Sequence, residues 1–377
     1  MIRIGITGQT GFLGTHLFNT LGLYPDRFIR IPFSDECFTD QDKLRSFVCQ
    51  CDVIVHLAAV IRHPDPVLLK EINIRLVYKL IEAMEAEEVA PYVLFSSSTQ
   101  EALPNPYGES KRMGRLLLEH WAQRNDASVT SLILPNLFGP FGRPEFNSFI
   151  ATFCYRLTHG QTACIESDNT VFLLYVGTLC RFVVDKIPLV IQSAERITEC
   201  LKVPHEIECS VSDMLEKLTY YKETYFDEGI IPSLKDCNDV NLFNTFRSYV
   251  DHLLRFPVRL TAHSDNRGVY VETIRTETGG QVASSTTLPG ITRGNHYHTR
   301  KVERFSVLRG KALICLRKVG TSEVFSFTLD GNEPSYVDIP VWYVHNITNI
   351  GDEVLYTQFW VNEWYQATDS DTYVESV

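Results

Sequence analysis

The chain has 377 residues, of which 44% are hydrophobic and 21% are charged, so it is long enough for two or three domains with hydrophobic cores. Its formal net charge is -11 and it has no run of lysines and arginines, which argues against nucleic acid and membrane as partners and favours a small substrate. Its ten cysteines show no Cys-x-x-Cys pattern and are typical of reduced thiols in a cytoplasmic protein. The first residues already resemble a strand, and no apolar run reaches about 18 residues, so neither secretion nor membrane spanning is indicated.

The first half of the chain alternates short, β-branched apolar runs with helical patterns. Strands are predicted at 2–7, 27–33, 53–58, 92–96 and 129–134, and helices at 12–21, 40–49, 65–86 and 107–123. This order predicts right-handed βαβ units and therefore an α/β domain with a Rossmann-type, doubly wound parallel sheet. We expect this domain to span residues 1–250.

Three glycines follow the first predicted strand and open the first predicted helix. Gly8 permits a tight turn, Gly11 lets the backbone approach a pyrophosphate, and Gly14 lets the helix pack closely on the strand. Small residues after the third strand would allow a dinucleotide to lie across the strand end. The predicted cofactor-binding residues in these segments are Gly8, Gly11, Phe12, Leu13, Gly14, Leu57, Ala58 and Ala59.

The second predicted strand bears on the choice of cofactor. It ends without a carboxylate that would bind the adenosine ribose of NAD, and Arg30 lies nearby to pair with a 2′-phosphate. Asp35 is close enough to keep NADH open as an alternative. The sequence therefore predicts NADPH.

Ser96 ends the fourth predicted strand, Ser97 and Ser98 follow it, and Tyr107 and Lys111 come next in the motif. The latter two share one face of a helix, so the ammonium can lower the phenol pKa and hold a nicotinamide ribose while a nearby serine polarises the substrate oxygen. With these motifs the chain resembles the extended short-chain dehydrogenase/reductases, which include nucleotide-sugar epimerases, dehydratases and reductases. The resemblance implies Ser98 as the catalytic hydroxyl, Tyr107 as the acid and Lys111 as its partner.

Two further stretches resemble the nucleotide-sugar binding region of that superfamily. They contain Asn136 and Asn147, which are predicted substrate contacts, although both could be polar turn residues. Leu134 and Gly177 stand near places where the family often has an arginine and an aspartate. The phosphate contacts in this region therefore stay open.

From about Leu254 the pattern changes to short strands separated by Gly, Pro, Asn and Asp. They are predicted at 269–275, 281–287, 303–308, 311–317, 324–329, 336–339 and 354–360. The absence of a helical period predicts an all-β antiparallel barrel or jelly roll at 255–377. The segment 238–256 is expected to join the two domains.

The stretch from Gly290 to Gly310 has the spacing of the first cupin motif. It contains His296, His298 and Glu303 at metal-site spacing. The segment 293–297 also resembles the metal-free 3,5-epimerases of deoxysugar synthesis, in which the histidine that matches His296 is a base. A site without metal is therefore the alternative.

A partial second cupin motif runs from Pro340 to His345, with Trp342 in place of the usual glycine. Together with the first motif, His345 would complete a set of three nitrogens and one oxygen that suits zinc, iron or manganese, and zinc is predicted. His296 and Tyr343 are candidate bases for a proton abstraction.

Over its whole length the chain resembles the bifunctional capsule and O-antigen enzymes of the CapF type, a reductase domain followed by a cupin. The matching segments are 105–111, 147–148, 150–155, 289–292, 294–296, 337–340 and 371–373. The resemblance implies a UDP-sugar substrate, UDP-2-acetamido-2,6-dideoxy-hexos-4-ulose, that is epimerised at C3 in the cupin and reduced at C4 with NADPH. The product would be UDP-2-acetamido-2,6-dideoxy-L-talose, on the route to UDP-N-acetyl-L-fucosamine. A homodimer joined through the cupin domain is expected.

The sequence leaves two other functions as alternatives. A single-function 4-keto-sugar nucleotide reductase would use the cupin only for structure and dimerisation, and would show no solvent exchange at C3. A non-catalytic, cofactor-sensing scaffold would be expected to have lost Tyr107 or Lys111, and both are present.

Overall fold

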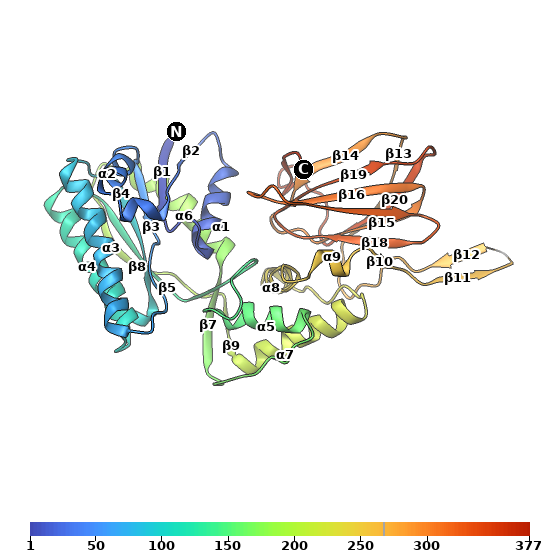
Figure 1. Ribbon diagram of the computed structural model, residues 1–377, viewed down its shortest axis with the longest axis horizontal. Helices are drawn as coiled ribbons and strands as arrows, with labels where there is room; N and C mark the ends of the chain where they lie inside the picture. Colours follow the sequence, from blue (N-terminus) through green and yellow to red (C-terminus); the bar gives the residue numbers. More distant parts are fainter. Residues whose placement is uncertain (267) are drawn as a thin grey trace. The chain divides into compact units, whose positions relative to one another are not determined.

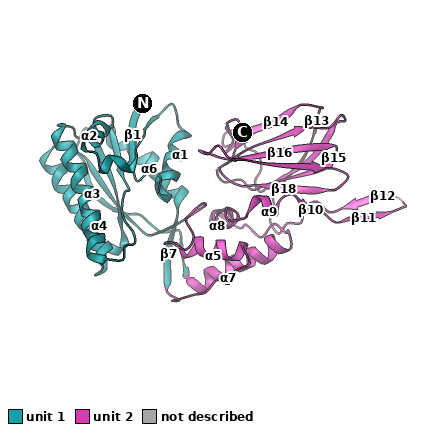
Figure 2. Cartoon of the chain, viewed as in Figure 1, with its two compact units in different colours: residues 1–138, 170–209 teal, residues 139–169, 210–377 magenta. Residues whose placement is uncertain are grey.

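The computed structural model describes residues 1–266 and 268–377, which form two compact units (Figures 1 and 2). Unit 1 comprises residues 1–138 and 170–209, and unit 2 comprises residues 139–169 and 210–377. These units do not coincide with the division into 1–250 and 255–377 that the sequence predicts. Segments 139–169 and 210–250 pack with the C-terminal sheets rather than with the first sheet.

Unit 1 contains a parallel six-stranded sheet in the order β2-β1-β3-β4-β5-β8. Its strands are β1 (Ile2–Thr7), β2 (Phe28–Ile31), β3 (Val53–His56), β4 (Tyr92–Ser98), β5 (Val129–Leu134) and β8 (Thr198–Lys202). The helices of this unit are α1 (Phe12–Gly22), η1 (Asp35–Phe38), α2 (Gln41–Cys49), α3 (Pro66–Ala86), η2 (Thr99–Ala102), α4 (Pro106–Arg124) and α6 (Val176–Ile191). In Figure 1, α3 and α4 cover one face of the sheet and α1 and α6 cover the other. The predicted doubly wound fold is confirmed.

Side-chain caps mark where α3 and α4 of unit 1 begin. Asp65 accepts hydrogen bonds from the first turn of α3, and Asn105 accepts one from Gly108 at the start of α4. In both helices a proline follows the cap, where its missing N–H costs nothing. This start places Tyr107 in the first turn of α4.

The strand order of the six-stranded sheet reverses between β1 and β3. The segments that follow these two strands are 8–11 and 57–65. Ligands of doubly wound sheets bind outside the carboxyl ends of the strands at such a point. The topology therefore brings the glycine segment and the 57–59 segment to the same edge.

A small three-stranded sheet, which the sequence did not predict, completes unit 1. It has the order β6-β7-β9 and consists of β6 (Asn136–Phe138), β7 (Thr170–Tyr175) and β9 (Ile207–Ser210). Gly177 is the second residue of α6, which begins directly after β7.

Unit 2 contains two antiparallel five-stranded sheets, in the orders β10-β18-β15-β20-β13 and β17-β16-β19-β14-β21. Their strands are β10 (Val258–Arg259), β13 (Gln281–Thr287), β14 (Thr292–Tyr297), β15 (Glu303–Arg309), β16 (Lys311–Lys318), β17 (Val324–Asp330), β18 (Ser335–Ile339), β19 (Tyr343–Asn349), β20 (Leu355–Val361) and β21 (Tyr373–Val374). A separate hairpin is formed by β11 (Ala262–Asp265) and β12 (Gly268–Val271). Side chains of both sheets share one hydrophobic core, which confirms the predicted all-β region. The sequence did not predict β14 and β19.

The remainder of unit 2 is helical. It consists of α5 (Phe149–Thr158), α7 (Val211–Tyr221), the π-helix η3 (Lys222–Asp227), α8 (Cys237–Arg247) and α9 (His252–Arg255). The segment 238–256, expected to be a connection between domains, instead forms α8 and α9. Asn244 donates to the Arg300 carbonyl oxygen at 2.7 Å, and Arg247 donates to that of Ile339 at 2.8 Å. The segment is therefore packed on the sheets.

A buried ion pair ties the helical part of unit 2 to its sheets. Arg304 on β15 and Asp338 on β18 are 1% exposed and make two hydrogen bonds of 2.7 and 2.9 Å. The Tyr225 hydroxyl of η3 donates to the same carboxylate at 2.8 Å, and the Arg304 guanidinium also donates to the Gly229 carbonyl oxygen at 3.0 Å. Each charge thus has partners that offset its loss of hydration.

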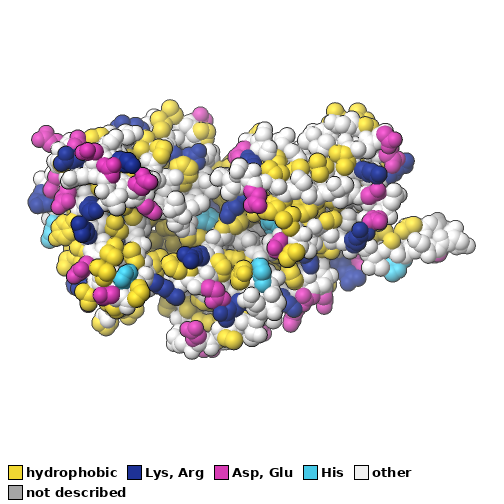
Figure 3. Space-filling model, in the orientation of Figure 1, with side chains coloured by type: hydrophobic (Ala, Val, Ile, Leu, Met, Phe, Trp, Pro, Cys, Tyr) yellow, Lys and Arg dark blue, Asp and Glu magenta, His cyan; other side chains and the backbone are white. Residues whose placement is uncertain are grey.

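Acidic and basic side chains are interspersed with hydrophobic ones on the face of the molecule seen in Figure 3. Within residues 1–266 and 268–377, no helix combines the length and the apolar character that crossing a membrane requires.

Candidate functional site

The glycine segment of unit 1 lies close to the segment that follows β3. Gly8 has a φ of 70°, and a Cβ atom there would lie 2.9 Å from the Ala58 Cα atom. A Cβ atom on Gly14 would lie 2.2 Å from the Gly8 carbonyl oxygen. Gly11 is the residue before α1 and has no side chain to occupy the N-terminal N–H groups of that helix. These groups form a cradle of the kind that binds phosphate.

The other predicted cofactor contacts on these segments are partly exposed at the same edge, namely Phe12, Leu13, Leu57 and Ala59. Beneath them, the Thr7 hydroxyl and His56 Nδ1 form a buried hydrogen bond of 2.7 Å between β1 and β3. Burial lowers the pKa of His56 to about 3, so its ring is neutral.

Arg30 is not brought to this cradle. Its guanidinium donates to the Phe18 carbonyl oxygen at 3.1 Å and lies 4.3 Å from the centroid of the Phe18 ring. Phe18 lies well inside α1, about 9 Å along the helix from its start. The predicted contact between Arg30 and a 2′-phosphate therefore needs a different side-chain conformation.

Tyr107 and Lys111 lie one turn apart on α4, as predicted from their spacing. The Lys111 Nζ atom lies 5.8 Å from the centroid of the Tyr107 ring and donates to the Ser96 carbonyl oxygen at 2.8 Å. Burial lowers the pKa of Lys111 to about 8. Burial also raises the pKa of Tyr107 to about 12, so the expected lowering of the phenol pKa is not found. The phenol keeps its proton at neutral pH, which is the form that an acid requires.

Ser98 ends β4 and caps η2, where its hydroxyl oxygen accepts the N–H of Gln100 at 3.2 Å. A hydroxyl that accepts one hydrogen bond can still donate its own proton. Glu101 of η2 accepts hydrogen bonds from Ser97 and from Arg115 of α4. The turn that carries Ser98 is thus attached to the helix that carries Tyr107.

The two predicted substrate contacts lie in different units. Asn136 begins β6 in unit 1, and Asn147 precedes α5 in unit 2; both side chains are exposed. Leu134 is buried at the end of β5. The role of the two asparagines in binding substrate stays a prediction.

In unit 2, the structure brings the four predicted metal ligands together. The ligand atoms of His296, His298, Glu303 and His345 all lie within 4.8 Å of one another. Glu303 Oε2 lies 3.1 Å from His298 Nε2 and 3.5 Å from His345 Nε2. His298 and His345 are far apart in the chain, so the cluster forms only because the fold brings the loop after β14 and the strand β19 together.

Three strands and a loop deliver these ligands. His296 lies on β14 opposite His345 on β19, where the strand register shifts between Gly294 and His296. Glu303 begins β15 in the facing sheet. Trp342, at the position where the cupin motif has glycine, has a φ of 62°, and its N–H donates to the His298 carbonyl oxygen at 2.7 Å. The turn before His345 is thereby attached to the loop after β14.

The electrostatics of the cluster favour the protonation states of metal ligands for His296, Glu303 and His345. Burial lowers the pKa of His345 to about 3 and also lowers that of His296, so both rings are neutral. Burial alone would raise the pKa of Glu303, but the facing imidazoles outweigh it and hold the pKa at about 2. Burial works against protonation of His298, but the Glu303 carboxylate outweighs it and raises the pKa of that ring.

Buried polar atoms at the centre of the cluster fit a metal ion. Within the described residues, Nε2 of His298, Nε2 of His345 and Oε2 of Glu303 are buried and have no hydrogen-bond partner of good geometry, although they face one another. Such atoms are costly unless something binds them, and three nitrogens with one carboxylate oxygen suit zinc. A cavity of about 460 Å³ adjoins the cluster and is lined by Arg293, Gly294, His296, Glu303, Phe305, Ile347 and Phe359.

The two candidate bases are placed differently. His296 lines the cavity. Tyr343 lies in the hydrophobic core, 7% exposed, with its ring 5.1 Å from that of His252, and burial raises its pKa to about 12. The structure therefore does not bring Tyr343 to the cavity.

Two backbone contacts that hold predicted site residues in place could not be predicted from the sequence. The Ser96 carbonyl oxygen accepts a hydrogen bond from the Lys111 ammonium, and the Asp371 carbonyl oxygen accepts one from His298 Nδ1. Both acceptors are backbone carbonyl oxygens, which every residue has, so the residue type does not indicate them. Asp371 is also 73 residues from His298, so spacing could not indicate the contact.

Two family models match the chain. The NAD dependent epimerase/dehydratase family matches residues 4–183, and the polysaccharide biosynthesis C-terminal domain matches residues 263–373. A UDP-2-acetamido-2,6-beta-L-arabino-hexul-4-ose reductase from Pseudomonas aeruginosa is 29% identical, over 100% of this chain and 99% of that protein.

Solved structures are similar as well. RMD from Pseudomonas aeruginosa, complexed with NADPH, covers 59% of this chain and 83% of its own at 22% identity and a TM-score of 0.51, which shows a shared fold. The capsular polysaccharide assembling protein CapF from Staphylococcus aureus is 31% identical, with a TM-score of 0.62, over 100% of both chains. On this full-length similarity, the chain belongs to the CapF family.

Proposed function

We propose that this protein is a bifunctional nucleotide-sugar enzyme. It epimerises C3 of UDP-2-acetamido-2,6-dideoxy-hexos-4-ulose in the C-terminal β domain and reduces the C4 ketone with NADPH in the N-terminal domain. The product is UDP-2-acetamido-2,6-dideoxy-L-talose, on the route to UDP-N-acetyl-L-fucosamine. The observation that carries the proposal is that each unit holds its own set of chemically matched groups, Tyr107 with Lys111 in one and the His/Glu cluster in the other.

Reduction uses the groups on β4 and α4. NADPH, when bound, supplies the hydride that C4 accepts. Tyr107 donates its phenolic proton to the ketone oxygen, and its raised pKa keeps that proton available at neutral pH. Ser98, at the end of β4, orients the ketone oxygen by donating a hydrogen bond. Lys111, held by the Ser96 carbonyl oxygen, places a positive charge beside the phenol and stabilises the phenolate left after transfer.

Epimerisation uses the cluster of unit 2. The C4 ketone acidifies the proton on C3, so removing that proton and returning one to the other face of C3 inverts the centre without a net change in composition. A divalent metal, when bound, supplies a Lewis acid for the negative charge that develops on the ketone oxygen. His296, His298, Glu303 and His345 would hold the ion. The adjoining cavity would hold the sugar.

Proton NMR of the product formed in D2O tests both steps. The expected product carries deuterium at C3 and has the talo configuration at C4. A product without deuterium at C3 would overturn the epimerase half, and recovery of unreduced ketone with NADPH present would overturn the reductase half.

A second function is favoured by one observation. The printed name of the Pseudomonas aeruginosa relative describes a reductase only. A reductase whose C-terminal β domain is purely structural would reduce the ketone with no exchange at C3, so the same spectrum separates the two functions.

The assembly is also a proposal. The edge strand β13 exposes the residues Val282 to Ser284, and the other edge of its sheet carries only the short strand β10. Pairing of such edges across a two-fold axis supports a homodimer joined through residues after about Leu254. Light scattering of the full chain should give twice the monomer mass, and a monomer at working concentrations would contradict it.

A further inference from the structure

The last residues of the chain run beside the strand that carries His296. In β21, Val374 pairs with His296 and Tyr373 pairs with Tyr297. The Glu375 N–H donates to the Asn295 carbonyl oxygen at 3.1 Å. The C-terminal segment thus forms an added edge strand next to the candidate metal cluster.

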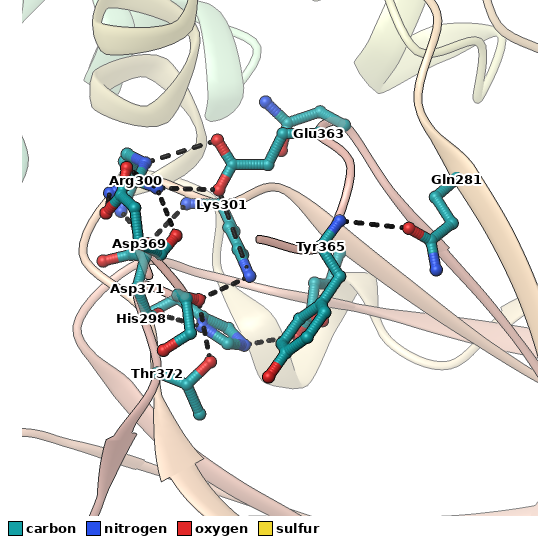
Figure 4. Close-up of polar contacts among 12 residues, drawn as sticks. Gln281, His298, Arg300, Lys301, Glu363, Tyr365, Asp369, Asp371 and Thr372 are labelled. Atoms are coloured by element: carbon teal, nitrogen blue, oxygen red, sulfur yellow. Dashed lines mark hydrogen bonds and ion pairs between the residues drawn. The ribbon is translucent and has the colours of Figure 1, made fainter. Parts of the chain in front are cut away.

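Asp371, just before β21, binds the loop that separates His298 from Glu303. Its carboxylate accepts the Thr299 hydroxyl at 2.7 Å and the N–H groups of Thr299, Arg300 and Lys301 at 3.0 to 3.3 Å. Figure 4 shows Asp371 beside Arg300, Lys301 and His298. The side chain is 4% exposed, so these hydrogen bonds replace its hydration. The φ of Asp371 is 44°, a conformation that Asp and Asn tolerate better than most residues.

The backbone of the same residue contacts the ligand. The Asp371 carbonyl oxygen is hydrogen-bonded to His298 Nδ1. Because a carbonyl oxygen can only accept, Nδ1 carries the proton in this hydrogen bond. When the ring is neutral, its Nε2 lone pair faces Glu303 and His345, which is the orientation that metal coordination requires.

We propose that Asp371 is a positioning residue of the metal centre. Its carboxylate holds the 299–301 loop, and its carbonyl oxygen holds the His298 ring with Nε2 directed into the cluster. The inference rests on the metal binding proposed above. It adds a residue from the end of the chain that touches neither metal nor substrate.

A neighbouring carboxylate provides a matched control. Asp369 pairs with Arg300 at 2.9 Å, and its side chain is 66% exposed. Asp369→Asn and Asp371→Asn therefore change the same charge two residues apart. Only the second change weakens the acceptor for three N–H groups.

The test measures zinc affinity by competition with a chelator, together with the melting temperature of metal-free and zinc-loaded full-length protein. Asp371→Asn should weaken zinc binding by about 10- to 100-fold, as loss of an outer partner of a metal ligand does, and should shrink the rise in melting temperature on adding zinc. Asp369→Asn should stay within about twofold of the wild type. Thr299→Val, which removes one hydrogen bond of the carboxylate, should weaken binding by a smaller factor.

The outcomes separate this inference from the proposed function. A wild type that takes up no zinc would overturn the metal centre and this inference with it. A zinc-binding wild type with unaltered affinity in Asp371→Asn would overturn the inference alone. An equal fall in the melting temperature of the metal-free and zinc-loaded forms would show a merely structural role and would also overturn it.

Discussion

In unit 1 the proposed acid Tyr107 and its proposed partner Lys111 come from one turn of α4, whereas in unit 2 the candidate ligands come from β14, β15, β19 and the loop after β14. The helix alone fixes the spacing of the first pair. The second set needs two sheets to face each other, because its members come from strands of both sheets. A local motif is therefore enough to predict the geometry of the first site, and the geometry of the second depends on the whole β domain.

The largest expected effects come from single substitutions that remove one activity and leave the other. Tyr107→Phe removes the proposed acid and should slow NADPH oxidation by about 10²- to 10⁴-fold, while deuterium exchange at C3 survives. His298→Ala should have the opposite pattern, because it removes a candidate metal ligand in the other unit. NADPH absorbance and NMR in D2O measure the two activities. If Tyr107→Phe reduced the ketone at nearly the wild-type rate, Tyr107 would not be the acid.

The buried ion pair of unit 2 offers a test of its non-local assembly. Asp338→Asn leaves the Arg304 charge buried with a weakened partner and should cost about 3–5 kcal/mol in the free energy of unfolding. Glu353→Gln is the control, because its pair with Arg309 is exposed and should change stability far less. Denaturant unfolding measures both. If the two substitutions lowered the free energy of unfolding equally, burial of the Arg304–Asp338 pair would make no extra contribution to the stability of this unit.

A buried neutral histidine in each unit predicts acid sensitivity in both. Burial lowers the pKa of His56 to about 3 and that of His252 to about 4, below the value of about 6.5 in an unfolded chain. Between these values the unfolded state binds protons that the folded state does not, so stability is complete above about pH 6.5 and falls as the pH decreases. At pH 5 each of the two rings should lower the free energy of unfolding by about 2 kcal/mol.

Unfolding curves at pH 7 and pH 5 measure this loss. His56→Gln should reduce the pH dependence, and the exposed His120→Gln should leave it unchanged. A wild type that is equally stable at both pH values would contradict the neutral, buried state of these rings.

The smallest effect concerns the cofactor. We expect kcat/KM for NADPH to exceed that for NADH by at least about tenfold, equivalent to about 1.4 kcal/mol. Arg30→Ala measures how much of that preference depends on Arg30, a residue of β2 whose guanidinium is hydrogen-bonded to Phe18 of α1. An unchanged preference in this variant would remove Arg30 from the cofactor site, and equal kcat/KM values in the wild type would refute the choice of NADPH.

Sequence patterns predicted those parts of the molecule in which neighbours in the chain are neighbours in space. The parallel strands, the helices between them and the pair Tyr107 and Lys111 follow from local periodicity. The strand β14 was missed because Gly294 and Asn295, with φ values of 102° and 59°, interrupt its alternation. The ligands on β14 and β19 were still predicted, since their motif spacing is independent of the strand pattern.

Other features depend on contacts that no local pattern encodes. The segments 139–169 and 210–250 pack with the C-terminal sheets, and α8 binds the backbone at Arg300 and Ile339. The pKa of Tyr107 depends on how deeply the phenol is buried, which spacing does not indicate. These features required the three-dimensional structure.

The alternation of the chain between its two units has a consequence for its synthesis. Residues 139–169 belong to unit 2, yet they leave the ribosome before β8, the last strand of the six-stranded sheet, and long before the sheets on which they finally pack. Since domains tend to fold as they emerge, unit 1 can close around its own strands while this segment still lacks its partners. In a protein truncated before the C-terminal sheets, residues 139–169 would lack the sheets on which they pack and would stay exposed. The two units therefore cannot be produced as separate proteins by dividing the gene at a single point.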